Sequence, residues 1–143
     1  MKALLGAHSG LRWVVLILLI YVIVNAFNKR KSGTYSAKDK MLSAMAMGFT
    51  HLQIVLGLII YFAGGHIKGL SEMSVAKLRF ISLEHPLMMI FGAVLITLGH
   101  IKAKKAGGPK RAYFYTYTFF GIGLLIILSR IPWPFLVEGA GWF

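Results

Sequence analysis

The stretch His51-Leu-Gln-Ile-Val-Leu-Gly-Leu-Ile-Ile-Tyr-Phe-Ala-Gly-Gly-His66 is apolar almost throughout and has a histidine at each end. The stretch His85-Pro-Leu-Met-Met-Ile-Phe-Gly-Ala-Val-Leu-Ile-Thr-Leu-Gly-His100 repeats both features with the same spacing of fifteen residues. A helix rises ~1.5 Å per residue, so this spacing covers roughly 22 Å of a hydrocarbon core that is ~30 Å thick. Each stretch therefore predicts a membrane-spanning helix with one imidazole near each face of the bilayer.

Four apolar stretches of this kind occupy most of the chain. A window of about 20 residues places them at residues 4–27, 41–64, 80–101 and 112–131. Apolar residues surround each predicted helix on all sides, as expected for helices in lipid rather than for amphipathic surface helices. We therefore predict an all-α fold in which residues 1–143 form a single transmembrane domain, a four-helix bundle.

The composition agrees with a membrane protein and indicates its orientation. The chain is 57% hydrophobic and 14% charged, against roughly 25% charged residues in soluble domains. Its mean hydropathy is +0.72. Residues 28–40 and 102–111 each carry five Lys or Arg, which predicts that these two connections are cytoplasmic and that both termini lie outside. We expect a multi-pass protein of a bacterial inner (cytoplasmic) membrane, in contact with the lipid bilayer.

Charge and cysteine content exclude several other classes. The net charge of +12 comes from basic residues in short loops and not from a basic stripe with interleaved aromatic residues, so we expect no nucleic-acid partner. The chain has no cysteine, which excludes disulfides, thiolate metal sites, iron–sulfur clusters and haem attached through a Cys-x-x-Cys-His motif.

The histidine spacing suggests a cofactor within the membrane. Because the chain turns back between the second and third predicted helices, His51 should lie at the depth of His100, and His66 near the depth of His85. Paired neutral imidazoles on facing helices are the ligands that a membrane-embedded b-type haem needs. We predict His51 and His100 as haem-iron ligands at the inner level. The alternative for His100 is a histidine in a last helical turn that faces carbonyls and headgroups.

At the outer level the partner of His85 is His8 or His66, and we favour His8. Arg12 lies one turn deeper than His8 on the same helix face, where its guanidinium is suited to bind a haem propionate. The alternative is that Arg12 snorkels to the interface. Gly10 is expected to let a flat macrocycle approach the backbone.

Glu84 has three interpretations, which the sequence leaves open. As a carboxylate near the outer end of a helix, it is placed to accept a proton from a quinol. It is equally placed to orient a ligand histidine by a hydrogen bond. The third interpretation is an interfacial acid beside Arg79 or Lys77.

Zinc is the other use of clustered histidines. A zinc site needs three or four converging ligands, and the chain has no short metal motif such as His-Glu-x-x-His. Zinc remains an alternative at the outer face, with ligands drawn from His8, His66, His85 and Glu84.

Four segments carry a resemblance to a known family: His8-Ser-Gly-Leu-Arg-Trp13, Thr50-His-Leu-Gln-Ile-Val-Leu-Gly57, Glu84-His-Pro-Leu-Met-Met89 and Ile131-Pro-Trp-Pro134. Together they resemble small four-helix membrane proteins of Bacteroidota that are commonly labelled "cytochrome B". The resemblance implies that His8, His51 and His85 lie within recurring motifs, and that at least one haem is held by the first three helices.

These observations predict a membrane b-type haem protein with one or two haem b groups. It would transfer electrons between a quinol or partner protein and another acceptor, because two imidazole ligands leave the iron no open position for oxygen chemistry. One alternative is a non-catalytic accessory subunit of a larger membrane complex, or a homo-oligomer. Another is an enzyme that acts on a lipid-soluble substrate through Glu84 and His85. The sequence does not decide whether the protein is an enzyme.

Overall fold

The computed structural model describes residues 1–137 and residue 141, and within them all regular secondary structure is helical. Four helices are long and apolar enough to cross a membrane, so the predicted fold class is confirmed. The long helices are α1 (Lys2–Asn28), α2 (Ala37–Ala63), α4 (His85–Lys104) and α5 (Pro109–Ser129). Shorter pieces join α2 to α4: a 3₁₀ segment (His66–Ser71), α3 (Ala76–Arg79) and a π-helical turn (Phe80–Glu84).

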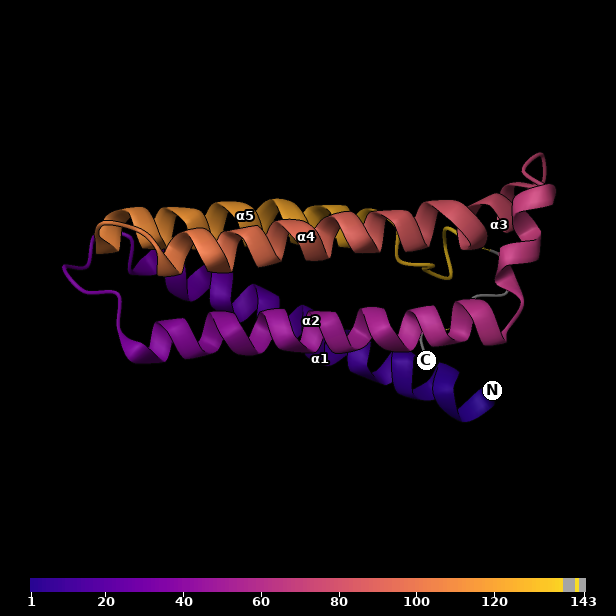
Figure 1. The fold of residues 1–143 in the computed structure, drawn as a ribbon, viewed down its shortest axis with the longest axis horizontal. Helices are drawn as coiled ribbons and strands as arrows, with labels where there is room; N and C mark the ends of the chain where they lie inside the picture. The colour runs from indigo at the N-terminus through magenta and orange to yellow at the C-terminus, as the bar shows by residue number, and fades with distance from the viewer. Residues whose placement is uncertain (138–140, 142–143) are drawn as a thin grey trace.

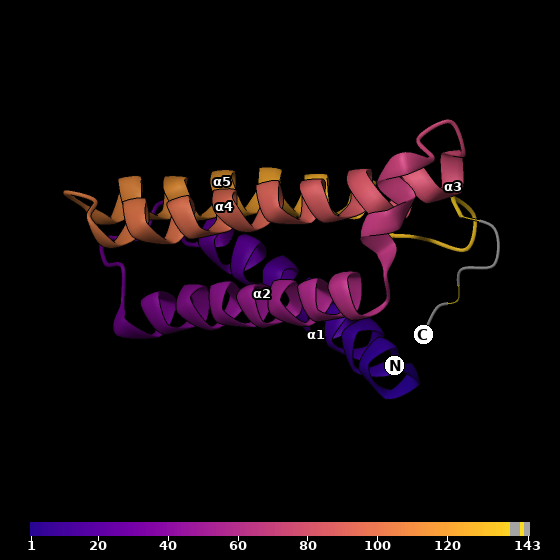
Figure 2. The ribbon, with the colours of Figure 1, turned by 45° about the vertical axis from the view of Figure 1, so that its right-hand side comes forward.

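The four long helices form a closed bundle in which each helix packs against two others (Figure 1). Helix α1 packs against α2 and α5, and α4 packs against α2 and α5. The two basic connections lie together at one end of the bundle, which we call the basic end (Figure 1). The start of α1, the end of α5 and α3 lie at the opposite end, which we call the histidine end (Figures 1 and 2). Positive residues mark cytoplasmic loops, so the basic end is the predicted cytoplasmic side.

The helix boundaries differ from the predicted ones for local reasons. Helix α2 begins at Ala37, four residues earlier than predicted, because Ser36 and Asp39 form a capping box. In it the Ser36 hydroxyl accepts from the Asp39 backbone N–H, and the Asp39 carboxylate accepts from the Ser36 backbone N–H. Helix α5 begins at Pro109, whose missing N–H is harmless in a first turn.

Helices α4 and α5 approach each other closely through glycine. A Cβ atom added at Gly99 would lie 2.6 Å from Cβ of Phe119, and one added at Gly92 would lie 2.7 Å from Cγ1 of Ile127. Gly123 faces Gly92, since its added Cβ would lie 3.0 Å from the Gly92 carbonyl oxygen. Small residues at such contacts bring helix backbones together where lipid supplies no hydrophobic driving force.

The interior of the bundle is apolar, and so is most of its outside. Leu19, Ile96 and Phe120 are fully buried between α1, α4 and α5. On the outer surface, large side chains such as Ile17 and Leu125 are 65% and 67% exposed. A soluble protein rarely exposes apolar surface so widely, whereas hydrocarbon chains solvate it without penalty.

A buried carboxylate holds the basic end together. Asp39 is 4% exposed, and Asn25 and Lys29 of the α1 end donate to its Oδ1 at 2.8 Å and 3.0 Å. The hydroxyl of Tyr113 on α5 donates to its Oδ2 at 2.8 Å. A carboxylate in this position is stable because its charge is paired and its oxygens accept several hydrogen bonds. Asp39 therefore joins α1, α2 and α5 and is structural.

Candidate functional site

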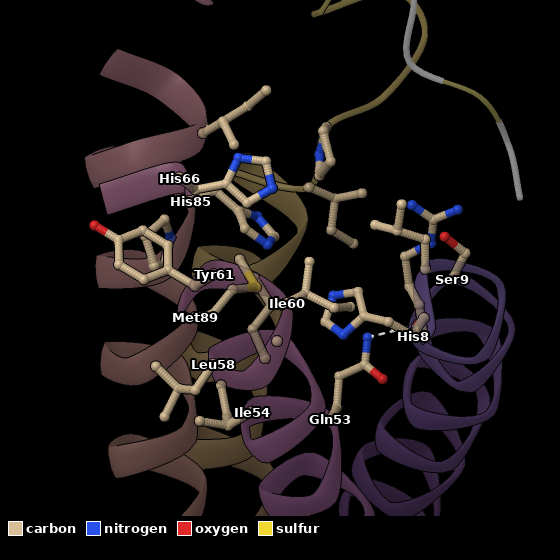
Figure 3. Close-up of a pocket in the computed structure, with 18 of the residues that line it drawn as sticks. His8, Ser9, Gln53, Ile54, Leu58, Ile60, Tyr61, His66, His85 and Met89 are labelled. Carbon is tan, nitrogen blue, oxygen red and sulfur yellow. Dashed lines mark hydrogen bonds between the residues drawn. The ribbon is translucent and has the colours of Figure 1, made fainter. Parts of the chain in front are cut away.

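A cavity of about 440 Å³ opens at the histidine end of the bundle, between α1, α2 and α4 (Figure 3). Its walls are mostly aliphatic, and three histidines from three different segments line it. These are His8 of α1, His66 of the 3₁₀ segment and His85 at the start of α4. The structure thus brings together all three histidines that were predicted at the outer level. The apolar lining includes Leu5, Leu16, Ile54, Leu58 and Met89.

His85 takes its position from an irregular turn in the helix. Pro86 has no N–H, so the carbonyl of Ser82 lacks its usual partner four residues on. The hydroxyl of Tyr61 on α2 supplies the missing donor, at 3.0 Å from the Ser82 oxygen. The π-helical turn Phe80–Glu84 lies directly before His85, and the hydrogen bond from Tyr61 to Ser82 joins this turn to α2. Such turns occur frequently at functional sites.

A hydrogen bond to the backbone fixes the tautomer of His85. Its Nδ1 lies 2.7 Å from the carbonyl oxygen of Arg130, in the segment that follows α5. A carbonyl oxygen only accepts, so Nδ1 carries the proton and Nε2 keeps a free lone pair. Fixing the second ring nitrogen in this way is the usual arrangement for a metal-binding histidine.

His8 faces His85 across a short distance. Their ring centroids lie 6.5 Å apart, and their planes are inclined by 79°. The Nδ1 atom of His8 is buried and has no hydrogen-bond partner among the residues that the structure describes. Gln53 of α2 donates to the His8 backbone carbonyl at 2.8 Å, which holds this part of α1 against α2. Gly57 makes room for the imidazole, since an added Cβ would lie 3.1 Å from Cε1 of His8.

His66 reaches the same cavity because two glycines turn the chain after α2. Gly65 has a φ of +70°, a conformation that favours glycine. A Cβ at Gly64 would lie 3.0 Å from Nε2 of His66, so the ring folds back over the end of α2. His66 and His8 both line the cavity. The ring that contacts His85 is that of His8, which favours His8 as its partner.

Arg12 also lines the cavity, as the prediction of a propionate contact requires. Its guanidinium carbon lies 5.4 Å from the ring centroid of Trp13 and 5.7 Å from that of Trp133. Aromatic faces of this kind hold an arginine in place by cation–π attraction. Gly10 is exposed, and within the described part of the chain an added Cβ there would meet nothing within 4 Å, so the approach of a macrocycle at Gly10 stays a prediction. Gly57 is the glycine that allows a close approach.

The predicted inner pair has hydrogen-bond partners on the facing helices. The Oγ of Ser43 donates to the Lys40 carbonyl at 3.0 Å, so it accepts from Nδ1 of the buried His100 at 2.9 Å. By the same reasoning Thr97 Oγ1, which donates to a backbone carbonyl, accepts from Nε2 of His51 at 2.8 Å. Among the described residues that line the cavity, neither histidine of this pair occurs. Iron ligation by His51 and His100 stays a prediction.

Glu84 lies between two arginines. Its Oε1 pairs with Nε of Arg79 at 3.0 Å, and its Oε2 with Nε of Arg130 at 3.3 Å. This favours the interpretation as an interfacial acid over that of a proton acceptor. Across the described part of the chain, no three His, Asp or Glu side chains lie close enough to hold a metal ion. The geometry therefore does not favour the zinc alternative.

Three contributions to this site escaped the sequence analysis: Gly57, Tyr61 and the Arg130 carbonyl. Gly57 appeared in the sequence only as the last residue of the segment that begins at Thr50. Pro86 did carry a usable signal, because a proline inside a helix always leaves one carbonyl in need of a new donor. The role of Arg130 follows from tertiary contact alone, since 45 residues separate it from His85.

Comparison of the chain with protein-family models, curated proteins and solved structures finds no match. Within its described residues the chain is a four-helix protein with four candidate membrane spans, and its resemblance to proteins labelled "cytochrome B" stays a prediction.

Proposed function

We propose that this protein is a membrane b-type cytochrome that holds one haem b between His8 of α1 and His85 of α4. The observation that supports this most is the separation of 6.5 Å between the two ring centroids beside one apolar cavity. Two metal–imidazole bonds of ~2 Å, with the ring radii added, separate ring centroids by about 6 Å. The buried Nδ1 of His8, which has no partner among the described residues, fits a ring that binds a metal, because a buried polar atom without a partner is destabilising.

The surrounding residues have complementary roles. His85 presents Nε2 as a lone-pair donor, because its Nδ1–H donates a hydrogen bond to the backbone carbonyl oxygen of Arg130. Arg12 supplies a fork of donors suited to a carboxylate such as a propionate. Aliphatic side chains, among them Leu16 and Met89, keep water from the centre of the cavity. Haem b bound there would supply one-electron redox chemistry, and ligation on both faces favours electron transfer over oxygen binding.

The donor and acceptor belong to the proposal as well. The cavity lies at the end that is predicted to face outward from a bacterial inner membrane, so a quinol in the outer leaflet or a partner protein is a suitable donor. The proposal needs only one haem. A second haem between His51 and His100 would have to coexist with, or replace, their hydrogen bonds to Thr97 and Ser43.

A second candidate function is a non-catalytic accessory subunit of a larger membrane complex. The observation that favours it is the same pair of hydrogen bonds, which shows two histidines of this bundle serving as links between α2 and α4. In that case the cavity histidines would contact a neighbouring protein or another copy of this chain. The two candidates differ in one property that is easy to measure, the presence of pigment.

The test is a reduced-minus-oxidised visible spectrum of the protein in mild detergent, with pyridine haemochrome quantification per chain. We expect a low-spin b-type spectrum and one haem per chain. His8→Ala and His85→Ala should each abolish it, while His51→Ala, a matched removal of an imidazole outside the cavity, should leave it intact. Circular dichroism checks that each variant is folded.

Three outcomes would overturn the proposal or a part of it. A colourless protein, expressed with haem supplied, would refute it and favour the accessory subunit. Two haems per chain, reduced to one by His51→Ala, would refute the single site and support the inner pair. Pigment that survives His8→Ala but not His66→Ala would transfer the ligand role to His66.

A further inference from the structure

A second cavity, of about 460 Å³, lies at the basic end of the bundle between the end of α1 and the start of α5. Four cationic residues line it: Arg30 and Lys31 after α1, and Lys110 and Arg111 in the first turn of α5. Both ribbon views place these two helix ends next to each other (Figures 1 and 2). The site is independent of the histidine cavity, which lies at the opposite end.

The charge of this cavity is not balanced by the protein. Among the described residues, the ion pairs join Lys29 to Asp39 and join Glu84 to two arginines, and none involves the four cations of the cavity. Asp39, the nearest acid in sequence, is already engaged by Lys29, Asn25 and Tyr113. Four like charges around one cavity repel one another, so a bound anion would stabilise the arrangement.

The floor of the cavity is aromatic. Phe114 and Tyr117 line it, and their ring centroids lie 5.7 Å apart. Phe27 packs against Tyr117 at 5.6 Å and carries the guanidinium of Arg30 at 3.9 Å above its ring. Phe114 and Phe27 are both 48% exposed on the outer surface of the bundle. A ligand that satisfies this site has an anionic group for the cations and an apolar part for the aromatic rings.

We propose that this cavity binds the phosphate of an anionic phospholipid, such as phosphatidylglycerol or cardiolipin, from the cytoplasmic leaflet. Basic pockets beside transmembrane helices on that side are suited to such headgroups. Aromatic side chains at the same level favour the boundary between headgroups and acyl chains. A free phosphate would satisfy the cations but would leave the exposed parts of Phe114 and Phe27 uncovered. The combination of charge and aromatic surface is what favours the lipid.

Binding of phosphatidylglycerol to the delipidated full chain in a neutral detergent tests the proposal, with native mass spectrometry as the readout. The double variant Lys110→Gln/Arg111→Gln removes two cavity cations. The control Lys104→Gln/Lys105→Gln removes the same charge from exposed positions at the same end that do not line the cavity. Phosphatidylcholine and inorganic phosphate are titrated in parallel.

We expect the cavity variant to bind phosphatidylglycerol roughly thirtyfold more weakly, at about 1 kcal/mol for each cation lost. The control variant should bind almost as the unaltered protein does, and phosphatidylcholine should bind weakly throughout. If both variants weaken phosphatidylglycerol binding equally, the binding depends on general surface charge and not on this cavity, and the proposal is overturned. If inorganic phosphate, at matched concentrations, occupies the cavity as well as phosphatidylglycerol does, the site binds free phosphate and the lipid proposal is overturned. Far-UV circular dichroism confirms that both variants keep their helix content.

Discussion

Replacing Gly99 with alanine tests how closely α4 and α5 pack. The added Cβ would lie 2.6 Å from Cβ of Phe119 and 3.1 Å from Cδ2 of Phe120. Carbon atoms in ordinary contact lie ~3.5–4.0 Å apart, so the two helices must separate locally by about 1 Å. The Cβ of Phe119 is bonded directly to the backbone and has no rotamer that would move it away. Overpacking of this kind destabilises a protein by about 1–3 kcal/mol.

Alanine also stabilises a helix relative to glycine by about 1 kcal/mol, which would partly mask the clash. Gly121→Ala on α5 is the matched control, because an added Cβ at Gly121 meets nothing within 4 Å. The difference between the two variants isolates the clash. We expect the free energy of unfolding of Gly99→Ala to be about 1–3 kcal/mol below that of Gly121→Ala. Reversible unfolding by SDS from mixed micelles, followed by circular dichroism, measures it. Equal stabilities would refute the close contact between α4 and α5.

Three further predictions concern the histidine cavity and the basic end. Gly57→Ala should displace the His8 imidazole, because the added Cβ would lie 3.1 Å from it, and should therefore lower the haem content per chain. Gly48→Ala, where an added Cβ meets nothing within 4 Å among the described residues, should leave the haem content unchanged. Identical visible spectra of the two variants would contradict this. Tyr61→Phe should lower the free energy of unfolding by about 1–3 kcal/mol, because it leaves the Ser82 carbonyl, four residues before Pro86, without its donor. The same SDS titration measures this effect, and unchanged stability would argue against that hydrogen bond. Asp39→Asn should lower the free energy of unfolding by a similar amount, about 1–3 kcal/mol, because an amide cannot accept the same set of hydrogen bonds; full stability would show that the carboxylate network is dispensable.

The outer histidines were predictable as a group, but their arrangement was not. Their positions near the ends of apolar stretches placed His8, His66 and His85 at one end of the bundle, and all three line the cavity there. The sequence favoured His8 as the partner of His85, and the ring contact between the two agrees with this preference. The tautomer of His85 depends on Arg130, which only the folded chain brings close. The spacing of residues along one helix does not predict a hydrogen bond between segments that are 45 residues apart.

For the inner histidines, iron ligation stays a prediction, and what the structure adds is their hydrogen bonds. Equal spacing of fifteen residues suggested that His51 and His100 face each other as the outer pair does. In the structure each ring also has a hydroxyl partner on the facing helix, Thr97 for His51 and Ser43 for His100. Depth in the membrane follows from counting residues, but rotation of a helix about its axis follows from packing. A shift of a single residue turns a side chain by ~100°, so depth alone cannot identify a partner.

By itself, the sequence determined four spans, their order and the gathering of basic residues at one end. These properties follow from the length of each apolar run and from the free energy of burying charge in lipid, and both act on each segment separately. Tertiary structure alone decided that Gly57 accommodates His8, that Tyr61 satisfies the carbonyl left by Pro86, and that Asp39 joins three helices. Lipid distinguishes poorly between one helix face and another, because both are apolar. Close packing and hydrogen bonds between helices must therefore set the rotation of each helix, and with it the side chains that meet in the cavity.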